Sequence, residues 1–68
     1  MASDKFDIYC TLKAKSKAAI LIETEDGDEI WIPHSQIDDD SELWEDSDIG
    51  EEGKLVISAW LAEKKGLL

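Results

Sequence analysis

The sequence predicts a mainly β fold, in which four or five short strands form a small bent sheet or barrel and one short helix follows them. Two observations carry this prediction. Apolar and polar residues alternate in short runs, which is typical of half-buried strands, and a helical pattern follows the last of these runs. A barrel would be SH3-like or OB-like, and an open meander covered by the helix is the alternative. The 68 residues form a single domain, 1–68, since this length leaves no room for a second core.

The first two strands follow from the residue pattern. Over residues 6–13, apolar side chains alternate strictly with polar ones, which predicts a strand with one buried face. Residues 18–24 are more apolar and rich in β-branched side chains, as in a second strand. The polar stretch between them, residues 13–17, should be a turn or a frayed strand end.

The hairpin after the second strand can be predicted in register. A two-residue loop at Asp26 and Gly27 would place a carboxylate on an apolar face. A three-residue loop, residues 25–27, pairs Ile22 with Ile30 and so keeps the apolar side chains together on one face of the hairpin. We therefore favour a type I turn with a G1 bulge, which requires Gly27 in the left-handed conformation.

Proline and a few apolar residues organise the middle of the chain. Pro33 should end the third strand because it has no N–H to donate to a ladder. Residues 34–37 should form a single turn that returns Ile37 to the core. Within the acidic residues 38–53, Leu43 and Trp44 are expected to anchor a short strand or helical turn, because a structureless loop of this length is unusual in a small domain.

The last strand and the helix are predicted for the remaining residues. Residues 54–58 form the last strand, and a serine suited to N-capping precedes a helix over residues 59–65. Trp60 and Leu61 supply the apolar side of this helix. Gly66 fits the C′ position of a Schellman motif.

The charge distribution is the strongest functional signal. The formal net charge is −10, and residues 18–53 hold fourteen Asp or Glu residues but no Lys or Arg. Such a field opposes binding to nucleic acid and favours a basic protein partner, or serves only solubility. The sequence does not distinguish a monomer from a homodimer.

The acidic residues do not form a known metal motif. An EF-hand loop that began at Asp38 would need Gly at the sixth position and Glu at the twelfth, where this chain has Leu43 and Ile49. A transition-metal site needs three or four nitrogen or sulfur ligands, and the only candidates are Cys10 and His34. We expect no metal, no cofactor and a solvated acidic face.

Catalysis is not expected either. Cys10 falls on the apolar side of its strand and should be a buried, inert thiol, while His34 beside Pro33 should occupy an exposed turn. The segment between Gly50 and Gly53 is acidic and would repel phosphate. We therefore expect a protein that is not an enzyme.

Cysteine usage and hydropathy indicate a compartment. A single cysteine excludes an intramolecular disulfide, which favours the cytoplasm, or the host-cell cytoplasm if the protein is viral. Residues 1–7 lack the charged and apolar regions of a signal peptide, and no apolar run is long enough to span a membrane.

A nucleic-acid module is the alternative function. OB-like barrels stack bases on aromatic side chains, and Tyr9 could act with a basic patch formed by Lys13, Lys15, Lys17 and Lys54. Against this, the three tryptophans each lie in an apolar stretch and should belong wholly or partly to the core. Trp44 is the one expected to be most exposed.

Three segments resemble short proteins of bacteriophages, prophages and their bacterial hosts. They are KAAILI at 17–22, EIWIPHSQI at 29–37 and AWLAEKKGL at 59–67. The resemblance covers most of residues 17–37 and 55–68, and this chain has His34 where that set usually carries Lys. It implies a phage context, in which small acidic proteins include anti-CRISPR proteins and other nucleic-acid mimics that inhibit host defence.

We therefore predict a small, acidic, phage-encoded binding protein that docks on a basic host protein or nucleoprotein complex. Replacing Asp38, Asp39 and Asp40 with asparagine should weaken that binding. The predicted contact residues are Asp38, Asp39, Asp40, Glu42, Trp44, Glu45, Asp46, Asp48, Glu25, Asp26 and Asp28.

Overall fold

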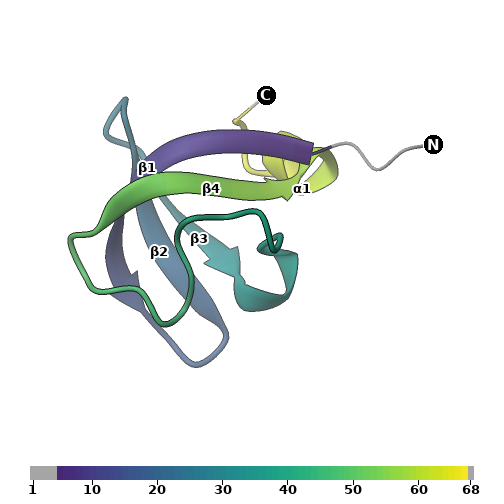
Figure 1. The fold of residues 1–68 in the computed structure, drawn as a ribbon. Coiled ribbons are helices and arrows are strands. Elements are labelled where there is room, and N and C mark those ends of the chain that lie inside the picture. The colour runs from purple at the N-terminus through teal and green to yellow at the C-terminus, as the bar shows by residue number, and fades with distance from the viewer. Residues whose placement is uncertain (1–4, 68) are drawn as a thin grey trace.

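A computed structural model describes residues 5–67 of the chain. Four antiparallel strands form one sheet in the order β3-β2-β1-β4, and a 3-10 turn (η1) and a C-terminal helix (α1) complete the fold (Figure 1). The elements are β1 (Lys5–Lys15), β2 (Ala19–Thr24), β3 (Glu29–Pro33), η1 (His34–Gln36), β4 (Glu52–Ser58) and α1 (Ala59–Lys64). The predicted mainly β fold with one C-terminal helix is confirmed. The expectation about a signal peptide at residues 1–7 rests partly on residues 1–4, which lie outside the described range.

The sheet is bent and open, so the barrel is not closed. β1 pairs with β4 over its first part and with β2 over its second, and the register shifts between Leu12 and Ala14. A bulge of this kind increases the twist and bends the strand. β1 continues to Lys15, so only the end of the polar stretch 13–17 remains outside the strand. Beyond β4, a single bridge joins Ile37 to Ile57. The turn predicted for residues 34–37 is therefore confirmed.

The hairpin between β2 and β3 has the predicted register. Ile22 lies opposite Ile30, and Gly27 has φ +92°, the left-handed region that favours glycine. The Gly27 N–H donates to the Thr24 carbonyl at 2.9 Å, and the Thr24 N–H donates to the Asp28 carbonyl at 2.8 Å. This is the three-residue loop with a G1 bulge that the apolar pattern predicts.

The core lies on one face of the sheet, beneath α1 and the residues that follow η1. Inward-facing side chains of β1, β2, β3 and β4 meet there, as the alternation in the first strand predicts. The buried cluster is Cys10, Leu12, Ile20, Ile22, Ile32, Leu43, Leu55, Ile57, Leu61 and Ala62.

The caps of α1 are those that the sequence predicts. The Ser58 hydroxyl accepts a hydrogen bond from the Leu61 N–H at 3.2 Å. Gly66 has φ +78°, and the Leu67 N–H donates to the Ala62 carbonyl at 2.8 Å, which closes a Schellman motif. A helix this short depends on its packing, which Leu61 and Ala62 provide.

The prediction that the tryptophans belong to the core is wrong. Trp31, Trp44 and Trp60 are 44%, 37% and 61% exposed, so Trp44 is the least exposed of the three. Trp31 lies opposite Leu21 in the register, on the face of the sheet turned away from the core. In α1, Leu61 and Ala62 form the buried side of the helix. Trp60 lies on the other, exposed side. Apolar neighbours in the sequence do not fix which side of an element faces the core.

Candidate functional site

Residues 38–51, here called the acidic loop, form a chain of turns. The turns are closed by N–H donation from Ser41 to Asp38, from Ser47 to Trp44 and from Glu51 to Asp48. The strand or helical turn predicted around residues 42–45 does not form. Leu43 alone anchors this part of the loop, with a side chain fully buried in the core.

The acidic loop covers the free edge of β4. The Asp38 N–H donates to the Val56 carbonyl at 2.8 Å, and the Glu42 N–H donates to the Lys54 carbonyl at 2.7 Å. In return, the Lys54 N–H donates to Glu42 Oε1 at 2.8 Å. Gly53 allows this close approach, because a Cβ there would lie 3.1 Å from Glu42 Oε1. The loop therefore satisfies backbone groups that a sheet edge otherwise leaves unpaired.

Ser41 makes the most buried polar contact between the loop and β4. Its Oγ accepts from the Val56 N–H at 2.8 Å and donates to the Val56 carbonyl at 3.1 Å. The serine is buried, so one hydroxyl takes the place of a strand partner at this position.

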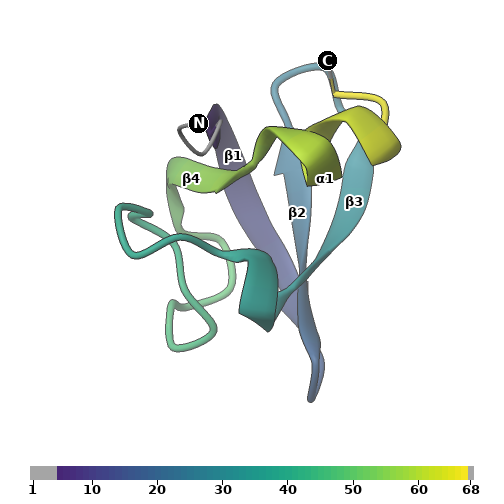
Figure 2. The ribbon, with the colours of Figure 1, turned by 90° about the vertical axis from the view of Figure 1, so that its right-hand side faces the viewer.

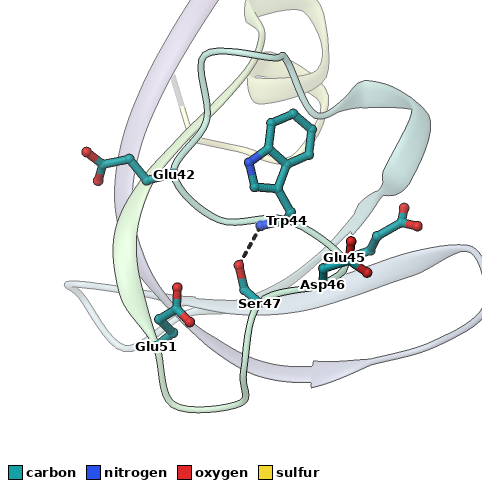
Figure 3. Close-up of a pocket in the computed structure, with 6 residues that line it drawn as sticks. All are labelled: Glu42, Trp44, Glu45, Asp46, Ser47 and Glu51. Carbon is teal, nitrogen blue, oxygen red and sulfur yellow. Dashed lines mark hydrogen bonds between the residues drawn. The ribbon is translucent and has the colours of Figure 1, made fainter.

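The carboxylates of the loop surround an open hollow of about 750 Å³. Figure 3 shows the indole of Trp44 and four acidic side chains around the turn that Ser47 closes by accepting from the Trp44 N–H at 2.9 Å. The lining residues are Glu42, Trp44, Glu45, Asp46, Ser47 and Glu51. The hollow therefore offers a negative potential beside one aromatic face, which suits a cationic side chain.

Lys5 neutralises one end of the loop. Its Nζ lies 3.1 Å from Asp38 Oδ2 and 3.7 Å from Asp40 Oδ2. The pKa of Asp38 is lowered, first by the hydrogen bond that its carboxylate accepts from the Asp40 N–H and then by Lys5. The pKa of Lys5 is raised, mainly by its hydrogen bond to Asp38. Asp38 is thus a structural residue more than a free contact residue.

Replacing Lys5 with alanine should raise the pKa of Asp38 without restoring its usual value, because the Asp40 N–H remains. A carbon-detected NMR titration of the carboxyl groups measures this shift, and Lys15→Ala is the control that should leave Asp38 unchanged. A lowered carboxyl pKa contributes stability above the unfolded pKa, and this contribution is lost as the pH falls. The contribution of Lys5 is lost as the pH rises through its raised pKa. An Asp38 pKa that is the same in both variants would contradict the ion pair.

His34 does not occupy the exposed turn position expected for it. Its side chain is half-buried, and Nδ1 lies 3.2 Å from Glu45 Oε1. Its Nε2 is buried and has no hydrogen-bond partner among residues 5–67. His34 therefore ties η1 to the acidic loop, a contact that depends on the folded arrangement of two separate segments.

The structure divides the predicted contact residues between two surfaces. The tip of the β2–β3 hairpin carries Glu25, Asp26 and Asp28 and lies beside Gly66 and Leu67. In Figure 1 this tip lies at the upper left, whereas the acidic loop runs below β4, and Figure 2 also separates them. The other predicted residues, Asp38, Asp39, Asp40, Glu42, Trp44, Glu45, Asp46 and Asp48, all belong to the loop.

Cys10 and the possible metal ligands are the remaining candidates for chemistry that the sequence raises. Burial raises the pKa of the Cys10 thiol to about 11, so this side chain stays protonated at neutral pH. Among residues 5–67, no three His, Cys, Asp or Glu side chains lie close enough together to hold a metal ion. No helix in this part of the chain is both long and apolar enough to cross a membrane.

A second hollow, which sequence reasoning missed, lies between η1 and α1. Its volume is about 330 Å³, and Figure 2 shows α1 above η1 with the acidic loop to the left. We call it the α1 groove; its lining residues are Pro33, Ser35, Gln36, Trp60, Leu61, Lys64 and Lys65. The sequence signal for it was the four-residue spacing of Trp60 and Lys64, which places both on one side of a helix.

Comparison with known proteins gives no relative. No protein-family model, no curated protein and no solved structure matches this chain. The resemblance to phage and prophage proteins therefore stays a prediction from the sequence.

Proposed function

We propose that this protein is a non-enzymatic binding protein that docks the acidic loop on a basic surface of a partner protein. The observation that carries the proposal is the way the loop is held. Its backbone is bonded to β4 and Leu43 is buried, while seven of its carboxyl side chains stay exposed: Asp39, Asp40, Glu42, Glu45, Asp46, Asp48 and Glu51. A loop that is already ordered loses less conformational entropy when it binds.

The sharpest form of this proposal is a phage-encoded inhibitor of host defence. Exposed carboxylates on a fixed scaffold can compete for the Arg and Lys side chains that normally hold phosphates. The partner would then be a host nuclease, a CRISPR effector or another nucleoprotein complex with a basic groove. The absence of Lys and Arg from residues 18–53 supports this form. Lys5 approaches the loop at Asp38 and Asp40, and the carboxylates beyond that end have no cation from their own segment among them.

Two triple variants with equal charge changes test the proposal. We expect Asp39→Asn, Asp46→Asn and Asp48→Asn together to weaken partner binding by about tenfold or more, since each removes an exposed charge from the loop. The matched control is Glu25→Gln, Asp26→Asn and Asp28→Asn on the hairpin tip. Asp38 is left intact because it is paired with Lys5.

Binding is measured by capture from a bacterial lysate on the immobilised protein, with low-salt and high-salt washes, followed by titration of the captured partner. Retention should fall at high salt because exposed charges are screened. Retention that is indifferent to salt and to the loop variant would overturn the proposal. Equal losses in both triple variants would show a general charge effect with no role for the loop itself.

A module for single-stranded nucleic acid is the second candidate. The observation that favours it is an exposed Tyr9 directly opposite Lys54, on the outer face of the sheet. However, Glu23, Glu25 and Glu52 line the same depression as Tyr9 and would repel a phosphate backbone. A fluorescence titration with oligothymidylate at low salt tests this function, and the absence of any response would exclude it.

A further inference from the structure

The α1 groove differs in charge from the rest of this acidic molecule. Its lining residues include Lys64 and Lys65 and no Asp or Glu. The formal net charge of the chain is −10, so the two lysines at the rim of this groove form a local positive region on a negative molecule. The positive potential near these two lysines therefore extends only a short distance before the negative potential of the rest of the molecule outweighs it.

The groove also holds the most exposed large apolar side chain among the described residues. Trp60 is 61% exposed, and the Lys64 Nζ lies 4.8 Å from the centroid of its ring. A cation at this distance is attracted to the indole face and restricts its motion. Leu61 and Pro33 continue the apolar lining. Exposed tryptophans in such pockets supply much of the binding energy of protein interfaces.

We propose that the α1 groove is a second binding site, which takes a peptide segment of another protein with an apolar side chain next to a carboxylate. The apolar side chain packs between Trp60 and Pro33, and the carboxylate pairs with Lys64 or Lys65. The volume of about 330 Å³ is at the lower end of the range for small-ligand pockets, and it suits one side chain with its neighbours. The protein then binds two partners of opposite charge on separate surfaces.

Charge complementarity selects this occupant over two others. A nucleic acid would extend beyond the two lysines and run over the acidic surface, where phosphates are repelled. A second copy of the chain would bring two net charges of −10 together. A short peptide with a few carboxylates contacts only the rim of the groove and avoids both costs.

The test uses the full chain labelled with ¹⁵N and a capped pentapeptide, Glu-Glu-Phe-Glu-Glu. We expect amide shifts in η1 and α1 and a shift of the Trp60 indole N–H. The variant Lys64→Glu with Lys65→Glu should weaken binding by about tenfold or more, and Trp60→Ala should do the same. The control Lys15→Glu with Lys17→Glu makes the same charge change at the β1–β2 turn and should alter affinity by less than about twofold. Circular dichroism checks that each variant is folded.

Several outcomes would overturn the proposal. Equal binding of Glu-Glu-Ser-Glu-Glu would show that no apolar anchor is used, and equal losses in the two lysine variants would show a general charge effect. Groove shifts of the same size with Lys-Lys-Phe-Lys-Lys would contradict the role of the rim. Displacement of the peptide by oligothymidylate would assign the groove to nucleic acid. A Trp60-dependent increase in mass with protein concentration, measured by sedimentation without peptide, would assign it to a second copy.

Discussion

Replacing Leu43 with alanine should destabilise the protein by about 2–5 kcal/mol, which is the usual cost of a cavity left by a fully buried leucine. Leu43 has no exposed surface, and it is the one member of the core cluster that the acidic loop supplies. A domain of this size has only about 3–5 kcal/mol of stability from its core. We therefore expect a large unfolded fraction at room temperature, measured by urea denaturation followed by circular dichroism.

The matched control is Ile49→Ala in the same loop. Ile49 is exposed, so its truncation should change the free energy of unfolding by no more than about 0.5 kcal/mol. If the two variants had the same stability, the loop would not be anchored through Leu43. The comparison also bears on the proposed function, since the loop carboxylates keep their positions only while this anchor holds.

The hairpin shows how far the sequence could predict the fold. Ile20, Ile22, Ile30 and Ile32 must share one face, and only one loop length achieves this with Gly27 in a left-handed conformation. Local pattern and turn chemistry agree there, so the register follows from the residues themselves. The caps of α1 were predictable for the same reason, because Ser58 and Gly66 act within one turn of the helix.

The acidic loop lacked such local signals. Leu43 and Trp44 are adjacent, and nothing in the sequence indicates which of them turns inward. Which of the two side chains turns inward depends on the position of residues 38–42, whose backbone is hydrogen-bonded to the free edge of β4. The sequence could therefore predict an acidic surface at these residues but not its shape.

Contacts between distant segments were invisible for the same reason. The pair of His34 with Glu45 joins η1 to the acidic loop, and the α1 groove joins η1 to the helix. The first contact has no local pattern, and the spacing of Trp60 and Lys64 indicates only the helix side of the groove. The exposed positions of Trp31 and Trp60 follow from strand register and from the packing of Leu61, which only the assembled core decides.

Ser41→Ala should cost about 1–3 kcal/mol, because it leaves the buried Val56 N–H without its partner, while the Val56 carbonyl keeps only the hydrogen bond from the Asp38 N–H. Urea denaturation measures this cost, and Ser47→Ala is the control, since Ser47 accepts only from an exposed backbone N–H. Amide hydrogen exchange gives a sharper measurement. Residues 55 and 56 face opposite edges of β4, so the Val56 amide should lose protection in Ser41→Ala beyond the global loss shown by Leu55, which faces β1. Equal losses at Leu55 and Val56 would mean that the variant acts only through global unfolding and that Ser41 does not close the edge of the sheet.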